Sequence, residues 1–225
     1  MTQAGLQAAG YRQPLPARSE TFFPSRCPTA MTTPFRYNRA LRFMHAFVAL
    51  AIVVQMVLTL LMEHPSARRT MSATGAFYFQ WHEWVGLAAV AVLAINWIYR
   101  LAKWKREGQG RLFPWIARDG RAQLGAELRD FVRMQWAAIP VDGALAGTVH
   151  GLGLLLATEL AATGVLLYVL LWPANVVTPL AKQLMEVHQF LGPAMWTFLA
   201  GHGAMAVWHH YSGERSVARM FSWRT

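Results

Sequence analysis

Four long apolar stretches, separated by polar and basic segments, dominate the chain after residue 40. They run from about 41 to 62, 77 to 101, 144 to 172 and 184 to 211. Each reaches the roughly 20 residues that a helix needs to cross the core of a bilayer. They lack the alternation typical of strands, and lipid offers no partner to an open backbone. The pattern therefore predicts an all-α membrane protein, a bundle of four transmembrane helices.

The composition and the placement of charge support a membrane protein. Only 14% of the 225 residues are charged, against about 25% in a soluble domain. The net charge of +10 would also suit a nucleic-acid binder. However, all but three of the 21 lysines and arginines lie near the start of the first stretch, around the connection between the second and third, or after the fourth. The positive-inside rule then predicts cytoplasmic termini in a bacterial inner membrane, with membrane lipid and not nucleic acid as partner.

Two segments outside the apolar stretches carry their own predictions. Residues 1–36 are rich in Pro, Gln, Ser and Arg, which predicts a disordered cytoplasmic tail without a cleavable signal peptide. Met31 is an alternative start, and the domain that follows is expected to span 37–222. The cytoplasmic connection, 104–143, is predicted to hold an amphipathic helix near 120–136, on the membrane surface or against a partner.

Histidine is the abundant metal-ligand type, with eight copies beside one cysteine, Cys27. A single cysteine excludes a disulfide framework, a C-x-x-C-H haem attachment and a four-cysteine iron–sulfur cluster. His188 and His202 lie 14 residues apart on the fourth stretch, which is about 21 Å of helical rise and within about 40° of one face. Matched by depth, His202 is expected to face His45 near the cytoplasm, and His188 to face His82 near the outside.

Two imidazole pairs at two depths predict two b-type haems, each held by two histidines. A zinc site would need about four ligands converging on one point. His82 and His188 also share the pattern H-x-x-x-G, which places Gly86 and Gly192 on the ligand's own helical face with room for a macrocycle. The alternative role of such glycines is close helix packing.

Three motifs connect the chain with a known family. They are Y-N-R-x5-H (Tyr37, Arg39, His45), the H-x-x-x-G at His82, and E-V-H-Q-F-L-G followed by H-G-A-M-A-V-W-H-H-Y. With these motifs, residues 36–222 resemble the bacterial cytochrome b561 family. That family comprises four-helix di-haem membrane cytochromes related to the b subunits of nickel–iron hydrogenases and formate dehydrogenases. The resemblance implies the same four ligands: His45, His82, His188 and His202. The chain departs in having His45-Ala46, where the family often has His-Trp, and in its longer 104–143 connection.

The resemblance also implies a function: an electron-transfer oxidoreductase component that exchanges electrons with ubiquinone or another quinone. One form is a stand-alone quinone oxidoreductase, for which a small diffusible oxidant or reductant such as superoxide is a candidate partner. The alternative is a haem b membrane anchor that serves a dehydrogenase subunit. A haem-free metal or proton transporter is the remote alternative, since no inverted repeat or broken helix pair supports it. The sequence leaves open the redox partner and a homo-oligomer.

Five further residues are candidates for supporting roles. His150, His209 and His210 are candidates for quinone contact or proton transfer, with a packed or interfacial histidine as the alternative. Glu159 is the one carboxylate expected in mid-membrane, where an ionisable group suggests proton transfer unless it is neutral and hydrogen-bonded. Arg39, from the first motif, is the candidate for pairing with a haem propionate.

Overall fold

The computed structural model describes residues 39–64, 71–103, 112–136, 139–140, 142–171 and 177–214. The chain divides into two units, Met1–Arg36 and Tyr37–Thr225, and every described residue belongs to the second. The predicted tail, with Met31 and Cys27, lies outside the described residues, so its disorder stays a prediction.

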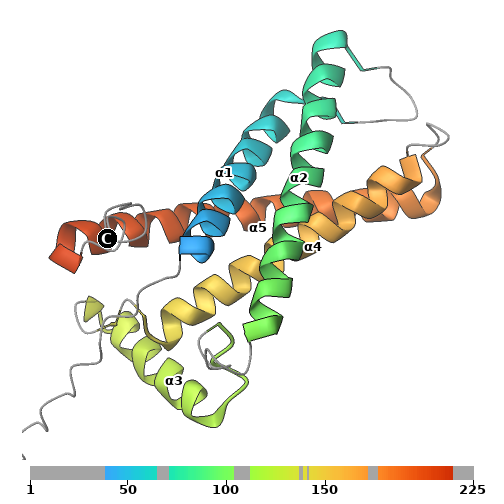
Figure 1. The fold of residues 1–225 in the computed structure, drawn as a ribbon. Coiled ribbons are helices and arrows are strands. Elements are labelled where there is room, and N and C mark those ends of the chain that lie inside the picture. The colour runs from blue at the N-terminus through green and yellow to red at the C-terminus, as the bar shows by residue number, and fades with distance from the viewer. Residues whose placement is uncertain are drawn as a thin grey trace, which may run out of the picture. The chain divides into compact units, whose positions relative to one another are not determined.

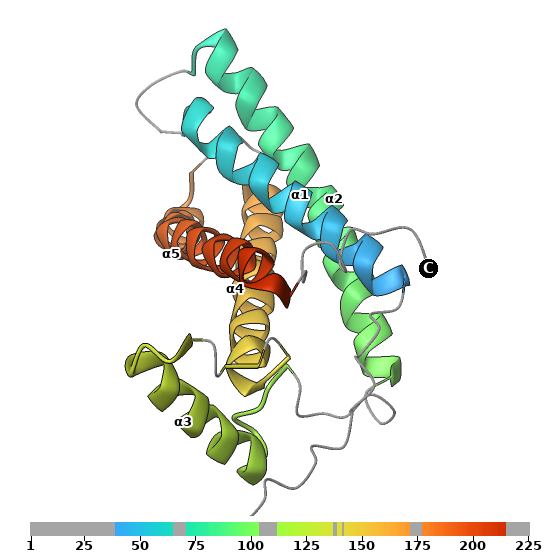
Figure 2. The same ribbon diagram turned by 90° about the vertical axis from the view of Figure 1, so that its left-hand side faces the viewer.

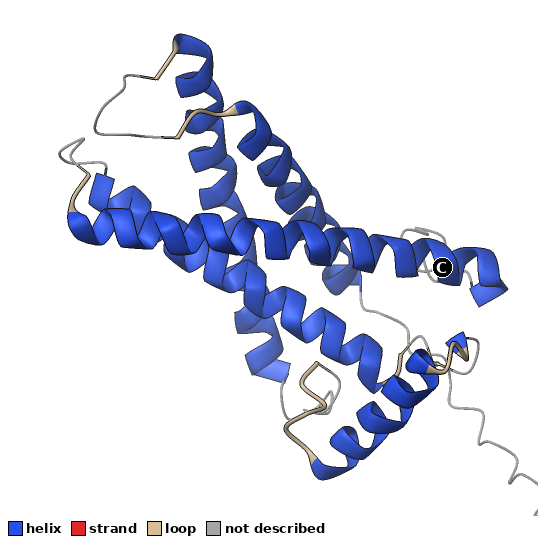
Figure 3. Cartoon of the chain, turned by 180° about the vertical axis from the view of Figure 1, so that it is seen from behind, coloured by secondary structure: helices blue, strands red, loops and turns tan. Residues whose placement is uncertain are grey.

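The predicted all-α fold is confirmed, since helices account for all the regular structure of the described residues (Figure 3). They are α1 (Arg39–Leu61), α2 (Ala73–Lys103), α3 (Arg118–Val132), α4 (Ala144–Leu171) and α5 (Pro179–His209), with a π-helical turn at His210–Glu214. Among the described helices, α1, α2 and α4 are long and apolar enough to cross a membrane. The fourth predicted crossing, α5, is not among them, because even its most apolar stretch includes Pro193, His202 and several glycines, which lower its mean hydropathy. A count of four crossings therefore stays a prediction.

The four long helices meet in one apolar core. Helix α1 packs along α2, and α4 packs along α5, while α2 also contacts α4 (Figures 1 and 2). Each of the four contributes one buried residue where they meet: Met56, Leu93, Ala157 and Met195. Met195 of α5 is 1% exposed, which makes it one of the most deeply buried large side chains described. Contact with this core holds α5 beside α1, α2 and α4.

Helix α5 starts five residues earlier than its apolar pattern predicts. Thr178 takes the N-cap position, and its Oγ1 accepts a hydrogen bond from the backbone N–H of Ala181 at 3.1 Å. Pro179 follows at the first helical position, where its fixed φ suits the helix and its missing N–H costs nothing. The hydrophobic pattern misses this start because the first turns are polar, while the capping residues define it.

The predicted amphipathic helix is α3, which the structure ends at Val132 rather than near 136. Its chain turns away through Met134, whose φ of 59° lies in the left-handed region that a helix cannot continue through. The helix exposes Leu128 and Val132 together with the basic residues Arg118 and Arg129. This mixed surface has the composition of an interfacial helix.

A buried carboxylate joins α3 to α4. Glu127 of α3 is 5% exposed, and it accepts hydrogen bonds from the backbone N–H groups of Ala144 (3.1 Å) and Leu145 (2.6 Å). A third bond comes from Gln123 Nε2 at 2.7 Å. These N–H groups belong to the first turn of α4, where no intrahelical acceptor exists and where negative charge is favoured by the helix dipole. Glu127 therefore caps α4 from a neighbouring helix and sets the position of α3.

Candidate histidine sites

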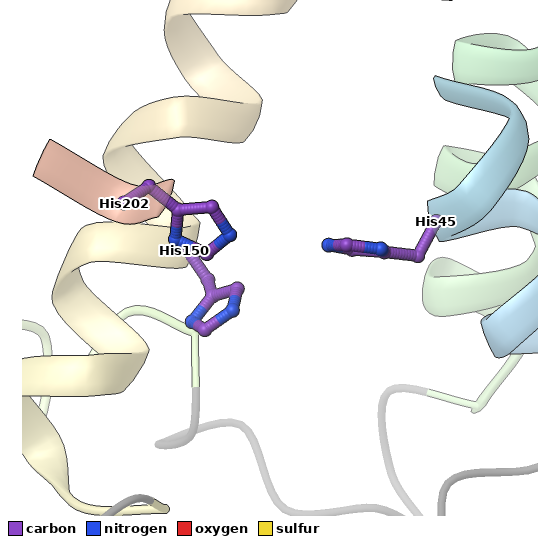
Figure 4. Close-up of side chains that lie close together, drawn as sticks. All are labelled: His45, His150 and His202. Carbon is purple, nitrogen blue, oxygen red and sulfur yellow. The ribbon is translucent and has the colours of Figure 1, made fainter. Parts of the chain in front are cut away.

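Three imidazoles from three helices gather at one site, here termed the histidine trio: His45 of α1, His150 of α4 and His202 of α5. One ring nitrogen of each lies within 4.8 Å of those of the other two. The ring centroids of His45 and His202 are 6.3 Å apart, and those of His150 and His202 are 5.0 Å apart. Figure 4 shows His150 and His202 side by side, with His45 opposite both of them.

A second site, the histidine pair, consists of His82 of α2 and His188 of α5. Their ring centroids lie 6.2 Å apart, with the ring planes at 86°. The structure thus brings together the same two sets that depth matching predicts, and it adds His150 to one of them. Helix α5 contributes to both sites, because His188 and His202 lie on one stripe of its surface.

The protonation of His188 follows from its hydrogen bonds. Its Nδ1 lies 2.8 Å from Oγ1 of Thr163, and that hydroxyl lies 2.7 Å from the backbone carbonyl of Glu159. A carbonyl only accepts, so the single hydroxyl proton points to it, and Nδ1–H of His188 donates to Thr163. The other nitrogen, Nε2, keeps its lone pair. This arrangement is the one that orients a metal-ligating histidine.

His150 is oriented by a different contact. Its Nδ1 lies 2.7 Å from the backbone carbonyl of Ala146, one turn earlier in α4. Since the carbonyl must accept, Nδ1 carries a proton, and Nε2 is the nitrogen left for a metal or another partner. His150 is therefore placed to act as a metal ligand or in proton transfer.

Buried polar atoms without partners also mark the two sites. Nδ1 of His45 and Nδ1 of His82 are buried and have no hydrogen-bond partner among the described residues. Beside His82, the Nε2 of Gln55 donates to the backbone carbonyl of His82 at 2.8 Å, while its Oε1 is buried without a partner. Such atoms are costly in a finished protein interior, which indicates sites built to receive a further group.

An apolar layer separates the trio from the pair. Met195 lies midway between His188 and His202 in sequence, seven residues from each, and so shares their stripe on α5. It packs with Met56, Leu93 and Ala157 in the core described above. The two sites are therefore distinct, since a layer of apolar side chains lies between them along α5.

The two glycines predicted to make room for a macrocycle differ in their surroundings. A Cβ added to Gly192 would meet nothing within 4 Å, so this position faces open space. At Gly86 the space is taken by the amide of Gln55, whose Nε2 would lie 2.6 Å from such a Cβ. Gly164 of α4 is a glycine that the motifs do not include. A Cβ added to it would lie 3.4 Å from Cε1 of His188.

The remaining sequence candidates lie outside the histidine sites. Arg39 opens α1 and is exposed, and the side chain of Glu159 is exposed on α4. His209 ends α5, and His210 begins the π-helical turn, with its ring 5.6 Å from that of Tyr211. Their predicted roles in propionate pairing, quinone contact and proton transfer stay predictions.

The sequence analysis did not identify two residues near the sites, Thr163 and Arg100. Thr163 orients His188, and its place as a polar residue inside the apolar run of α4 could have indicated such a role. Arg100 lies near enough to His45 for their charges to interact, and its Nε donates to Oδ1 of Asn96 at 2.8 Å. The signal there is the i, i+4 spacing of Asn96 and Arg100 within an apolar helix.

The ring separations test which metal group these sites fit. Metal–nitrogen bonds of about 2 Å on opposite sides of an iron put two imidazole centres roughly 6 Å apart. The observed 6.3 Å for His45–His202 and 6.2 Å for His82–His188 match that value at both sites. The trio, taken alone, would also suit a zinc ion with an open fourth position. The pair has no third described ligand of this kind, so a group that would be held by two histidines fits both sites, and zinc fits one.

The fold and these sites define a class: a helical membrane protein whose imidazoles are placed to hold metal between its helices. A family model described as prokaryotic cytochrome b561 matches residues 36–223. The chain therefore belongs to the prokaryotic cytochrome b561 family, as its motifs predicted, and b-type haem with membrane electron transfer comes with that membership. No match was found among curated proteins or among solved structures.

Proposed function

We propose that this protein transfers electrons across the bacterial inner membrane through two b-type haems and exchanges them with a membrane quinone, ubiquinone or another. The observation that carries the proposal is the near-equal ring separation at two sites on one helix, 6.3 Å and 6.2 Å. A haem iron with imidazoles on both sides supplies a one-electron couple and has no open position for O₂.

The side chains of this protein hold and orient the two groups. His45 and His202 are the proposed ligands of one haem, and His82 and His188 those of the other. Thr163 keeps His188 in the tautomer that presents Nε2. The 14 residues between the two α5 ligands correspond to about 21 Å along the helix, so the two haems would lie at different depths with the Met195 layer between their centres.

This function requires α5 to be the fourth crossing, with both termini in the cytoplasm. In support, α5 has 31 residues and packs along α4, which is itself apolar enough to cross. The concentration of basic residues on the side of the termini also supports it. Fusing alkaline phosphatase to the C-terminus should give no periplasmic activity, whereas the same enzyme inserted between α4 and α5 should be active. Activity at the C-terminus would exclude four crossings with a cytoplasmic N-terminus.

Quinone and proton transfer are assigned to the candidates outside the ligand sets. His209 lies seven residues past His202 at the end of α5, and His210 follows it, so these two are proposed to line a quinone site at the cytoplasmic interface. Glu159, within the apolar span of α4, is proposed to carry protons. His209→Ala should then raise the KM for quinol while leaving both haem spectra unchanged. An unchanged KM would remove His209 from the site.

The main proposal is tested by a reduced-minus-oxidised absorption spectrum of the purified protein with a haem assay and metal analysis. We expect a b-type signal, two haems per chain and no stoichiometric zinc. Absence of a b-type signal would overturn the proposal. Zinc bound at one equivalent per chain would favour a metal-ion site at the trio. Purification as a single chain that keeps quinone-reactive haem would separate a stand-alone oxidoreductase from an anchor for a dehydrogenase.

A further inference from the structure

The two histidine sites differ in the number of imidazoles that can reach one metal. At the trio, ring nitrogens from His45, His150 and His202 all lie within 4.8 Å of one another. The pair offers only His82 and His188 among the described residues. A haem held by two histidines would use two ligands, so one imidazole of the trio would be in excess.

The excess imidazole is on the same side as His202. His150 and His202 lie edge to face, with centroids 5.0 Å apart, and both are opposite His45 (Figure 4). Phe198 stacks on His202 at 5.3 Å, with the planes at 10°, and holds its ring in place. His150 comes from α4 and His202 from α5, so the two rings reach this side from separate helices.

The hydrogen bond of His150 restricts which atom it can offer there. Its Nδ1 is committed to the carbonyl of Ala146, 2.7 Å away, which leaves Nε2 available for a further contact. An imidazole Nε2 is a common metal ligand. His150 shares this site with two other imidazoles, and one ring nitrogen of each lies within 4.8 Å of those of the others.

We propose that His150 is a reserve axial ligand, so that His150 and His202 are alternative ligands, opposite His45, for one haem iron. The inference rests on the proposed function, since it presupposes haem at the trio. In the exchange, Nε2 of His150 would take the place at the haem that Nε2 of His202 leaves, and no electron would be transferred.

The test compares His202→Ala with His188→Ala, which removes the equivalent ligand of the same helix at the site without a third imidazole. The readouts are haem per chain and the electron paramagnetic resonance spectrum of the oxidised protein. We expect His202→Ala to keep two low-spin haems, with one signal shifted. The shift arises because the ring planes of His150 and His202 differ by 85°. His188→Ala should keep only one low-spin haem.

The double variant His202→Ala, His150→Ala identifies the substitute ligand. It should lose the low-spin signal that His202→Ala retains, while the haem of the His82–His188 pair persists and reports a folded chain. Loss of the same signal in His202→Ala alone would overturn the inference. Wild-type protein with two low-spin haems separates that failure from a failure of the proposed function, in which the wild type itself would lack them.

A second route covers the case in which His202→Ala does not fold. His202→Gly is produced with imidazole in the medium, which fills the vacated position, and the imidazole is then removed by dialysis. A low-spin signal that survives dialysis and disappears when His150→Ala is added supports the reserve ligand. A signal that disappears on dialysis with His150 present overturns it.

Discussion

Thr163 Oγ1 lies 2.8 Å from Nδ1 of His188 and donates a hydrogen bond to the carbonyl of Glu159 at 2.7 Å. This contact fixes which nitrogen of His188 is available, because the Nδ1 proton must point at the hydroxyl. It links α4 to α5 through a side-chain hydrogen bond. Removing the hydroxyl of Thr163 tests how strongly this hydrogen bond affects the binding of haem by His188.

We expect Thr163→Val to weaken haem binding at the His82–His188 site by about 10- to 100-fold, the usual effect of losing a partner that orients a metal-ligating histidine. Valine keeps the shape of threonine and removes only the hydroxyl. Haem titration of the apoprotein measures the affinity, and the haem at the other site serves as an internal reference. Thr197→Val is the matched control on α5, because its exposed hydroxyl bonds only to the carbonyl of Pro193. Equal effects of the two variants would contradict an orienting role for Thr163.

The pairing of ligands predicts which variants share a phenotype. His82→Ala and His188→Ala should lose the low-spin signal of the same haem and leave the other intact, because their rings face each other at 6.2 Å. Redox titration followed at the haem absorption bands resolves the two components and shows which one is missing. If the two variants lose different components, the pairing is wrong.

Glu127→Ala should lower the free energy of unfolding by about 2 kcal/mol, the scale of a lost helix cap and of buried donors left unmet. The first N–H groups of α4 would lose their acceptor, and α3 would lose its attachment. Thermal unfolding in detergent, followed by circular dichroism, measures the change. Asp119→Ala removes an exposed carboxylate from the same helix and should have little effect. A comparable loss in both variants would indicate a general charge effect.

Gly153→Ala tests the contact between α4 and α5 beside His202. A methyl group at Gly153 would collide with the ring of Phe198, and that ring stacks on His202. We expect a loss of about 1 to 3 kcal/mol from overpacking and a changed resonance signal for the haem at the trio. Gly201→Ala, next to His202 but with nothing within 4 Å of its added Cβ, is the control. An unchanged signal in Gly153→Ala would show that Phe198 does not position His202.

Much of the architecture could be predicted from local patterns. The runs that became α1, α2 and α4 exceed a bilayer's thickness in length, and lipid excludes any open backbone, so their helical form follows from composition. The placement of His188 and His202 on one stripe follows from the helical repeat alone. The boundary of α5 was less accessible, because capping by Thr178 and Pro179 precedes its apolar pattern.

Contacts between helices were decided only by the tertiary structure. A helical repeat specifies which residues share a face but not which neighbour that face meets, since this depends on the rotation and crossing of each helix. The sequence therefore made His150 a candidate for quinone contact or proton transfer, and only packing brought it from α4 beside His202. For the same reason the sequence indicated ligands but neither the hydroxyl of Thr163 that orients His188 nor the carboxylate of Glu127 that caps α4.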